Sequence, residues 1–293
     1  ETDCWVRGSG PVVLFCHREV IVKRCLWLAY PGPPIPLECL LFGSEHSLIQ
    51  QSLSSRLGRR VTNGDGFGIG WYGSRPIPGL YRDTLPAWKD ANLRSLAEQI
   101  ESPLFFAHVR ATTGTSTARV NCHPFRHGTW LFMHNGQIGD YLKIRRDIDL
   151  RITPELYPYR EGSTDTEAMF YLTMSNGLAD DPLAAMSATI ADIEGMMAAG
   201  GCGGAFRMTV AASNGERIIA YRYSSDRASP SLFYIQGEAL AERISHDCGD
   251  CGGDAVLVVS EPLDDDTADW TEVPDAHMLI AQEGEITLTP LAL

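Results

Sequence analysis

The sequence predicts an α+β protein built in layers, and three observations support this prediction. Short apolar runs bounded by turn residues occupy the region from 25 to 136. Two long segments with helical spacing follow, at 162–178 and 182–200. Four more strand-like runs then come one after another toward the C-terminus. Helices grouped between two sets of strands are typical of layered α+β domains.

The first set of apolar runs is interpreted as strands. Residues 25–30 (CLWLAY) read as a strand that the following PGPP ends. Residues 64–73 alternate glycine with larger side chains, as a strand does where another backbone passes close by. Residues 103–111 and 129–136 are apolar runs bounded by turn signals, so we expect two buried strands there.

The helices are predicted from spacing and from capping residues. Residues 44–57 have helical spacing with Ser44 as a candidate N-cap, and residues 90–101 are amphipathic. The segment 162–178 opens with a capping box formed by Thr164 and Glu167. The C-terminal strands are expected at 205–213, 217–223, 231–237 and 255–263. With no repeat and no convincing linker, we expect residues 25–293 to form one domain.

Composition and charge narrow the class of function. Of 293 residues, 44% are hydrophobic and 21% are charged, which is ordinary globular usage. The formal net charge of -13 argues against a protein that binds phosphate backbones. No stretch is suited to span a membrane, because prolines interrupt the long uncharged run that begins at residue 25. We therefore expect a small-molecule substrate and neither nucleic acid nor membrane as a partner.

The eight cysteines are irregularly spaced, and no secretory leader precedes them. They do not read as a disulfide framework, so we expect a cytoplasmic protein. His246, Cys248 and Cys251 lie close together near the C-terminus. A closed zinc site needs four ligands, so this cluster predicts a loop rather than a metal site. A thiol pair in such a loop could oxidise.

Four polar clusters stand at the ends of predicted strands or helices. They are Cys25; then His108, Arg110, Thr112 and Thr113; then His123, His134, Asn135 and Gly136; and finally Asp165. Each has a purely structural explanation when taken alone. A cysteine fills a core, an arginine joins an ion pair, Asn-Gly forms a hairpin turn, and an aspartate favours a helix N-terminus.

Taken together, the clusters fit the cleavage of a primary amide in an amino-acid substrate. Cys25 supplies a thiol, the most reactive nucleophile among ordinary side chains. Asn135 and the N–H of Gly136 supply two donors for an oxyanion. Arg110 matches a substrate carboxylate, with a further hydrogen bond from Thr113, and Asp165 matches a substrate ammonium group.

The base that activates Cys25 is left open by this reasoning. His108, His123 and His134 are candidates for a Cys-His pair, and the sequence distinguishes none of them. A cysteine at the start of a chain has another choice, its own α-amino group. The reference pKa values of the amine and the thiol are about 8 and about 8.5, so proton transfer between them is nearly balanced.

Six ordered motifs carry a resemblance to a known family. They are CLWLAYPGPPIPL, NGDGFGIGWYG, FFAHVRATTGT, NCHPF, LFMHNGQI and STDTE. The sequence resembles the class II glutamine amidotransferases, which are N-terminal nucleophile hydrolases, and in particular their stand-alone, YafJ-type branch. The likeness runs from Cys25 to about the end of the chain and is strongest up to Glu167.

The resemblance implies a four-layer αββα sandwich of two stacked antiparallel sheets. It implies Cys25 as the nucleophile with its own freed amino group as the base, and Asn135 with Gly136 as the oxyanion hole. The substrate-binding residues that it implies are Arg110, Thr113 and Asp165, with His123 in support. No metal or organic cofactor is required. Related stand-alone members degrade glutathione or hydrolyse γ-glutamyl intermediates of ergothioneine synthesis, so any γ-glutamyl amide is an expected substrate.

The start of the chain departs from this family. Arg24 and 23 further residues precede Cys25, and while the Arg24–Cys25 bond is intact the nitrogen of Cys25 is an amide and not a base. We expect residues 1–24 to be an upstream extension, either a propeptide or an artefact. A mis-set start or foreign sequence is favoured on composition. The chain as written is expected to be inactive until it is trimmed.

Two other functions stay open alongside hydrolysis. The protein could be the glutaminase-type subunit of a larger complex and need a protein partner, which a constant companion in pull-down would favour. It could also be a non-catalytic γ-glutamyl metabolite-binding protein. In that case Arg110→Ala abolishes binding while Cys25→Ala changes nothing measurable.

Overall fold

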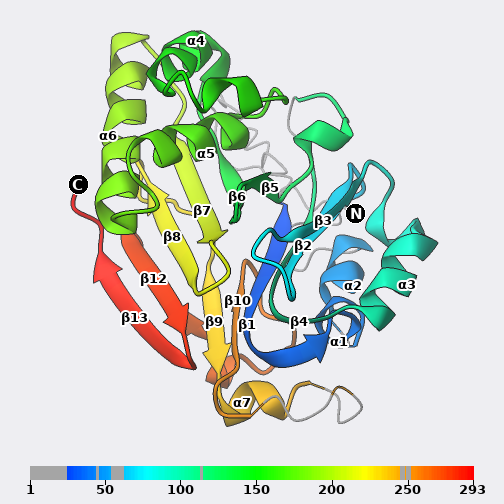
Figure 1. The fold of residues 1–293 in the computed structure, drawn as a ribbon. Helices are drawn as coiled ribbons and strands as arrows, with labels where there is room; N and C mark the ends of the chain where they lie inside the picture. The colour runs from blue at the N-terminus through cyan, green and yellow to red at the C-terminus, as the bar shows by residue number, and fades with distance from the viewer. Residues whose placement is uncertain (1–24, 44–45, 54–62, 113–114, 245–247, 249–251) are drawn as a thin grey trace, which may run out of the picture.

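The computed structural model describes residues 25–43, 46–53, 63–112, 115–244, 248 and 252–293. The upstream segment 1–24 and the proposed N-cap Ser44 lie outside the described residues, as do Thr113, His246 and Cys251. The described chain forms two antiparallel sheets between two layers of helices (Figure 1). The predicted four-layer αββα class is confirmed.

The first sheet has seven strands and carries the start of the described chain. Its strands, in spatial order, are β11 (Thr271–Glu272), β9 (Phe233–Gln236), β10 (Val256–Val259), β1 (Leu26–Pro36), β4 (Glu101–Val109), β2 (Phe67–Tyr72) and β3 (Gly79–Asp83). The order places the first described strand, β1, between strands from two distant parts of the sequence, β4 and β10. The residues that follow β4 and β10 therefore lie beside the residues that precede β1.

The second sheet has six strands. Their spatial order is β13 (Glu285–Pro290), β12 (His277–Gln282), β8 (Ile218–Ser224), β7 (Phe206–Ser213), β6 (Trp130–Ile138) and β5 (Phe125–His127). The predicted strands β6, β7 and β8 are present. The C-terminal hairpin of β12 and β13 was not predicted, because half-exposed β13 has only a weak apolar pattern.

The space between the two sheets is filled by apolar side chains from both. Trp27 and Phe106 of the first sheet pack with Leu131 and Met133 of the second, and all four are buried. The indole Nε1 of Trp27 also donates to Thr209 Oγ1 of β7 at 3.3 Å. This bond crosses between the sheets and fixes β1 relative to β7.

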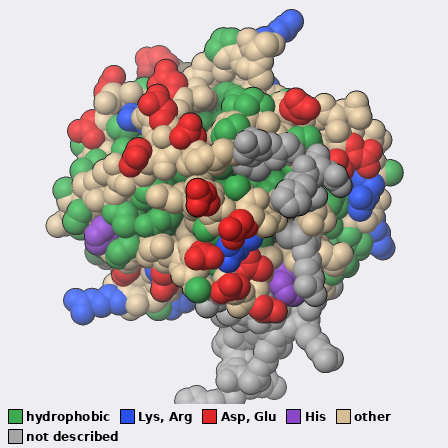
Figure 2. All heavy atoms as spheres, turned by 90° about the horizontal axis from the view of Figure 1, so that it is seen from below, with side chains coloured by type: hydrophobic (Ala, Val, Ile, Leu, Met, Phe, Trp, Pro, Cys, Tyr) green, Lys and Arg blue, Asp and Glu red, His purple; other side chains and the backbone are tan. Residues whose placement is uncertain are grey.

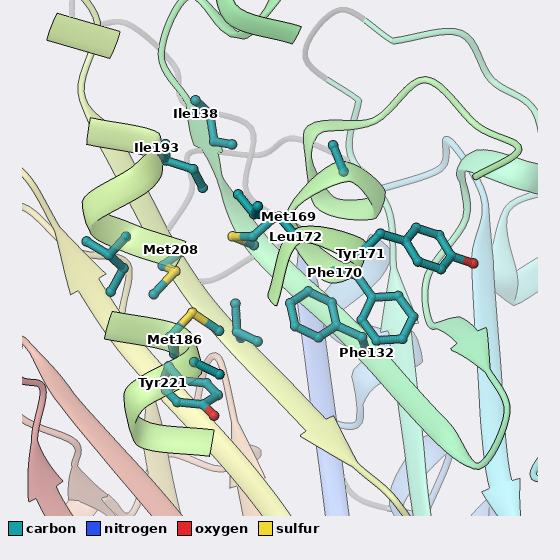
Figure 3. Close-up of a cluster of buried hydrophobic side chains, with 14 of the residues drawn as sticks. Phe132, Ile138, Met169, Phe170, Tyr171, Leu172, Met186, Ile193, Met208 and Tyr221 are labelled. Carbon is teal, nitrogen blue, oxygen red and sulfur yellow. The ribbon is translucent and has the colours of Figure 1, made fainter. Parts of the chain in front are cut away.

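Helices cover the outer face of each sheet. The seven-stranded sheet carries α1 (Glu38–Leu41), α2 (Leu48–Leu53) and α3 (Ala91–Gln99), and α7 (Glu238–Ala241) follows β9. The six-stranded sheet carries α4 (Tyr141–Arg151), α5 (Asp165–Ser175) and α6 (Pro182–Ala199). Figure 3 shows α5 and α6 packed on this sheet, where Phe170 stacks on Phe132 with ring centroids 4.9 Å apart.

The predicted end of the first strand was wrong. Strand β1 does not stop at the PGPP segment but continues to Pro36, with an irregular register between Pro31 and Ile35. Strand β10 pairs with β1 only around Leu28 and Ala29. The proline-containing half of β1 thus has a ladder partner on one side, β4, and prolines are tolerated where a strand N–H has no partner to meet.

One pair of cysteines corrects the expectation that disulfides are absent. Cys39 of α1 and Cys248 form a disulfide with a Cα–Cα distance of 6.0 Å, although 209 positions separate them in sequence. The adjacency of β1 and β10 brings the segments that carry them together. Cys248 thus pairs with Cys39, and not with Cys251 as the loop interpretation suggested.

The surface is consistent with the acidic composition. Figure 2 shows acidic side chains spread widely over one face of the molecule, with fewer basic ones among them. Among the described residues, no helix has both the length and the apolar character that crossing a bilayer requires.

Candidate active site

Cys25 lies directly before β1, at the point where the two sheets meet. The register of β1 and β4 pairs Leu26 with Val109, so Cys25 lies beside the residues that follow β4. Its Sγ is 3.3 Å from the N–H of Ala111 and 3.5 Å from the carbonyl oxygen of the same residue. Burial raises the pKa of this thiol to about 11. The thiol is therefore protonated near neutral pH and needs a base to become a nucleophile.

The three candidate histidines are buried and are held in their neutral form. Burial lowers the pKa of His108 to about 3, and the Arg110 guanidinium lowers it further. Burial also lowers the pKa values of His123 and His134. Among the described residues, the hydrogen-bond partner of the Cys25 thiol is the Ala111 backbone and none of these imidazoles. The geometry does not favour a Cys-His pair.

The histidines instead support the strand that carries Asn135. His108 Nε2 lies 3.2 Å from Asn135 Oδ1, and this bond fixes the orientation of the amide. His123 stacks on His108 with ring centroids 4.2 Å apart. His134 Nδ1 lies 2.9 Å from Thr166 Oγ1 in α5.

Asn135 and Gly136 lie within β6 and not at a hairpin turn. Asn135 Nδ2 donates to the carbonyl oxygen of Cys25 at 2.5 Å, so the amide already points at the nucleophile residue. Gly136 has φ of +138°, and a Cβ at this position would lie 1.9 Å from the carbonyl oxygen of Arg207. Only glycine fits there. The pair can offer a side-chain N–H and a backbone N–H to an oxyanion.

Arg110 is buried, and the oxygens that it contacts are neutral. Its exposure is 3%. Its Nη2 donates to Thr115 Oγ1 at 2.5 Å and to Thr112 Oγ1 at 3.3 Å, and its Nη1 donates to the carbonyl oxygens of Asp65 and Ser116. Within the described part of the chain, no carboxylate forms a salt bridge with it. A buried guanidinium of this kind is suited to bind an anionic ligand.

Asp165 begins α5 and faces a cavity of about 520 Å³. Its Oδ2 accepts from the N–H of Ile138, and its Oδ1 accepts from the N–H of Thr166. Gly136 and Thr115 line the same cavity. The oxyanion donor, the acidic residue and a hydroxyl bonded to Arg110 thus surround one space.

The predicted capping box is half confirmed. Thr164 Oγ1 accepts from the N–H of Glu167 at 3.2 Å, as predicted. The carboxylate of Glu167 accepts from the N–H groups of Glu161 and Gly162 instead of from the N-cap residue. This pair of bonds fixes the segment that leads into Asp165.

One predicted site residue lies outside the description, and two residues at the site were missed by the sequence analysis. Thr113 is outside the described residues, and Thr115 is the hydroxyl that the structure places against both Arg110 and the cavity. Asp65 was not singled out; its Oδ2 accepts from the N–H of Thr112 at 2.8 Å and so holds the loop after Arg110. The close backbone approach predicted for the glycine strand is confirmed, because a Cβ on Gly68 would lie 2.2 Å from the carbonyl oxygen of His123.

A second, smaller cavity lies on the side of Cys25 that the sequence analysis did not consider. Its volume is about 30 Å³, and Cys25, Asn135, Ser231, Ser260 and Glu261 contribute to its lining. Glu261 and Ser260 follow β10 directly. Among the described residues, no group of three or more His, Cys, Asp or Glu side chains is arranged to hold a metal ion.

Comparison with known proteins agrees with this arrangement. Residues 44–292 match the family model described as glutamine amidotransferases class-II. The chain is 33% identical to the probable glutamine amidotransferase DUG3 of Saccharomyces cerevisiae, over 91% of this chain and 84% of that protein. It is 28% identical to the gamma-glutamyl-hercynylcysteine sulfoxide hydrolase of Mycolicibacterium smegmatis, over 91% of this chain and 100% of that protein.

Solved structures extend the comparison to the fold. A glutamine aminotransferase class-II domain protein from Silicibacter pomeroyi is 38% identical and superposes with a TM-score of 0.70, over 92% of this chain and 100% of that chain. The glutamine phosphoribosylpyrophosphate amidotransferase of B. subtilis is 15% identical and shares the fold with a TM-score of 0.58, over 92% of this chain and 50% of that chain. By its sequence, its two-sheet fold and its relatives, the chain belongs to the class II glutamine amidotransferase family and is an amidohydrolase of that type.

Proposed function

We propose that this protein hydrolyses the γ-amide bond of glutamine or of a γ-glutamyl compound, with Cys25 as the nucleophile. The observation that carries the proposal is the placement of Arg110. Its buried guanidinium has no described carboxylate partner, and it lies behind Thr115 at a cavity that Gly136 and Asp165 also line. A γ-glutamyl group has an α-carboxylate for the arginine and an α-ammonium for the aspartate.

Arg110 and Asp165, which we call the clamp, would hold the α-carboxylate and α-ammonium end of the substrate and leave its other end free. The α-carboxylate would replace the two threonine hydroxyls that now accept from Arg110 Nη2. The α-ammonium would add a donor to the carboxylate of Asp165, whose oxygens each accept a backbone N–H. With both α-groups held, the γ-carbonyl would be directed toward Asn135, Gly136 and the thiol.

The proposed reaction proceeds through a thioester. The α-amino group of a trimmed Cys25 takes the thiol proton, and Sγ forms a bond to the γ-carbonyl carbon. Asn135 Nδ2 and the N–H of Gly136 hold the resulting oxyanion. The ammonium group returns its proton to the leaving nitrogen as the C–N bond breaks. Water then attacks the γ-glutamyl thioester, gives its proton to the amine, and releases glutamate and the thiol.

The thiol pKa sets a requirement on this base. With residues 1–24 attached, burial raises the pKa of the Cys25 thiol, whereas the reference pKa of an α-amino group is about 8. The transfer in the trimmed protein is favoured where the site stabilises the thiolate-ammonium pair. While Arg24 is attached, the nitrogen is an amide and the transfer does not occur.

The names of the relatives widen the substrate class without fixing the leaving group. One relative is named as a glutamine amidotransferase and the others as hydrolases of a γ-glutamyl compound. Both kinds of substrate carry the same γ-glutamyl end. Hydrolysis needs water alone as the acceptor, so the proposal requires no partner subunit.

The proposal is tested by comparing the full chain with a protein trimmed to begin at Cys25. Each is incubated with glutamine, glutathione and other γ-glutamyl amides, and released glutamate is measured. We expect the trimmed protein alone to turn over at least one of them. Cys25→Ala in the trimmed protein is expected to abolish turnover and retain binding by calorimetry. Cys202→Ala, which removes another free thiol, is the matched control.

Two results would contradict the proposal, the first its base and the second its chemistry. If the full chain is as active as the trimmed protein, the α-amino group is not the base. If the trimmed protein binds a γ-glutamyl compound but never releases glutamate, the protein is a binding protein and the catalytic proposal fails.

A further inference from the structure

We propose that Glu261 is a positioning residue that holds the freed α-amino group of Cys25 and stabilises it as the proton acceptor. The inference rests on the proposed function, because it concerns the mature N-terminus that this reaction needs. It assigns a role to a buried carboxylate that lines the smaller cavity beside Cys25.

The strand register brings Glu261 to the N-terminus of the trimmed chain. The antiparallel pairing of β1 and β10 matches Leu28 with Val259. The ladder continues for one more residue, because the N–H of Ser260 donates to the carbonyl oxygen of Trp27 at 3.0 Å and the N–H of Trp27 donates to Ser260 Oγ at 3.0 Å. The next position along places Glu261 opposite Leu26, next to Cys25.

The small cavity shows that Glu261 and Cys25 share one enclosed space. Its volume of about 30 Å³ is lined by Cys25, Asn135, Pro230, Ser231, Ser260 and Glu261. This is close to the share of liquid volume of one water molecule, about 30 Å³, so the space suits one ammonium group. Glu261 itself is 4% exposed.

The carboxylate of Glu261 and the new N-terminus can carry opposite charges. Trimming at Cys25 creates an α-ammonium group at the cavity that Glu261 lines. An opposite charge within about 4–6 Å favours the protonated amine. A more basic amine takes the proton of the Cys25 thiol more readily.

The two carboxylates near Cys25 would then have separate tasks. Asp165 lines the larger cavity with Gly136 and would bind the ammonium group of the substrate. Glu261 lines the smaller cavity and would bind the ammonium group of the enzyme. The amino group is thereby held at a different cavity from the one that Asp165 lines.

The test measures the pKa of the Cys25 α-amino group in trimmed protein by NMR, using ¹³C-labelled cysteine. The signal is assigned by its loss in Cys25→Ala. We expect Glu261→Gln to lower the amine pKa by about one unit or more, because a nearby opposite charge is removed. Glu261→Asp keeps the charge but shortens its reach, and is expected to shift the pKa in the same direction by less. Glu285→Gln, an exposed carboxylate on β13, is the control.

The pH dependence of activity provides a second measurement of the role of Glu261. The acid limb of the pH profile of kcat/KM is expected to move to lower pH with the amine pKa in Glu261→Gln. An amine pKa equal to that of the unaltered protein in both Glu261 variants would overturn the proposal. If Glu261→Gln does not fold, Glu261→Asp alone decides in the same way. The NMR result stands even if the trimmed protein hydrolyses nothing, so failure of the proposed function is recognised separately.

Discussion

Two arginines beside two cavities differ in the charge of the groups that they contact. Arg110 is 3% exposed and donates to hydroxyl and carbonyl oxygens. Arg243 lines a cavity of about 350 Å³ near the disulfide and forms salt bridges to three aspartates. Its Nε lies 2.6 Å from Asp264 Oδ2, and its Nη2 lies 2.9 Å from Asp269 Oδ2.

Aspartates of the protein already neutralise the guanidinium of Arg243, whereas the described contacts of the Arg110 guanidinium are neutral oxygens. A ligand carboxylate would have to displace aspartates at Arg243 but only hydroxyl groups at Arg110. Charge balance, and not cavity size or arginine burial alone, is therefore our reason for proposing that Arg110 binds the anionic group of a ligand. Three experiments test whether the two arginines differ in function as their contacts suggest.

The largest expected effect comes from Arg110→Ala in trimmed protein. Loss of the buried cation removes the partner of the substrate carboxylate, which costs about 2–5 kcal/mol and lowers kcat/KM by about 30- to 4,000-fold. Arg110→Lys is expected to recover only part of the loss, because an ammonium group does not bind a carboxylate in bidentate fashion. Steady-state kinetics on the best substrate measures both. Unchanged kcat/KM in Arg110→Ala would show that Arg110 does not bind the substrate carboxylate.

An intermediate effect is expected from Arg243→Ala, and it should appear in stability instead of activity. The side chain is 18% exposed and ties together the segment from Asp264 to Asp269. Removing it leaves partly exposed aspartates without their cation, at a cost of about 1–3 kcal/mol in the free energy of unfolding. Urea denaturation measures this change, with the exposed Arg146→Ala as control. A loss of kcat/KM comparable to that of Arg110→Ala would show that the second cavity also serves the reaction.

The smallest effect concerns the neutral histidines around Arg110. Burial holds the pKa of His123 well below its usual value. The unfolded chain therefore binds more protons than the folded chain once the pH drops below about 6.5, so stability falls as the pH falls. His123→Phe keeps a ring against His108 and removes one such site. We expect its stability loss with falling pH to be shallower by up to about 1.4 kcal/mol per pH unit.

Thermal unfolding of both proteins between pH 7 and pH 4 measures this difference. The two curves should separate progressively toward acid. Parallel curves would mean that His123 is not held neutral in the folded protein.

Much of the fold and the site could be predicted because local patterns and global contacts agree there. The apolar runs that became β4 and β6 are buried on both faces, and the polar residues at their ends meet at Cys25. The cap at Thr164 is local and was predicted from four residues. Such features depend on short stretches of sequence.

The rest depends on contacts that no short stretch reveals. The disulfide between Cys39 and Cys248 and the placement of Glu261 both follow from β10 pairing with β1 across more than two hundred residues. The continuation of β1 through its prolines depends on where β10 begins. Helix α4 was not predicted, because its sequence is rich in charge and its apolar positions are few.

The central claim is that Cys25 forms a γ-glutamyl thioester only when it is the first residue. The most direct test is intact mass spectrometry of acid-quenched single turnovers with glutamine, on trimmed protein and on the full chain. The account predicts a mass increase of one γ-glutamyl group, located on Cys25, in the trimmed protein alone, and no such adduct in Arg110→Ala. Trimmed protein that binds glutamine without forming the adduct, or a full chain that forms it equally fast, would contradict the account.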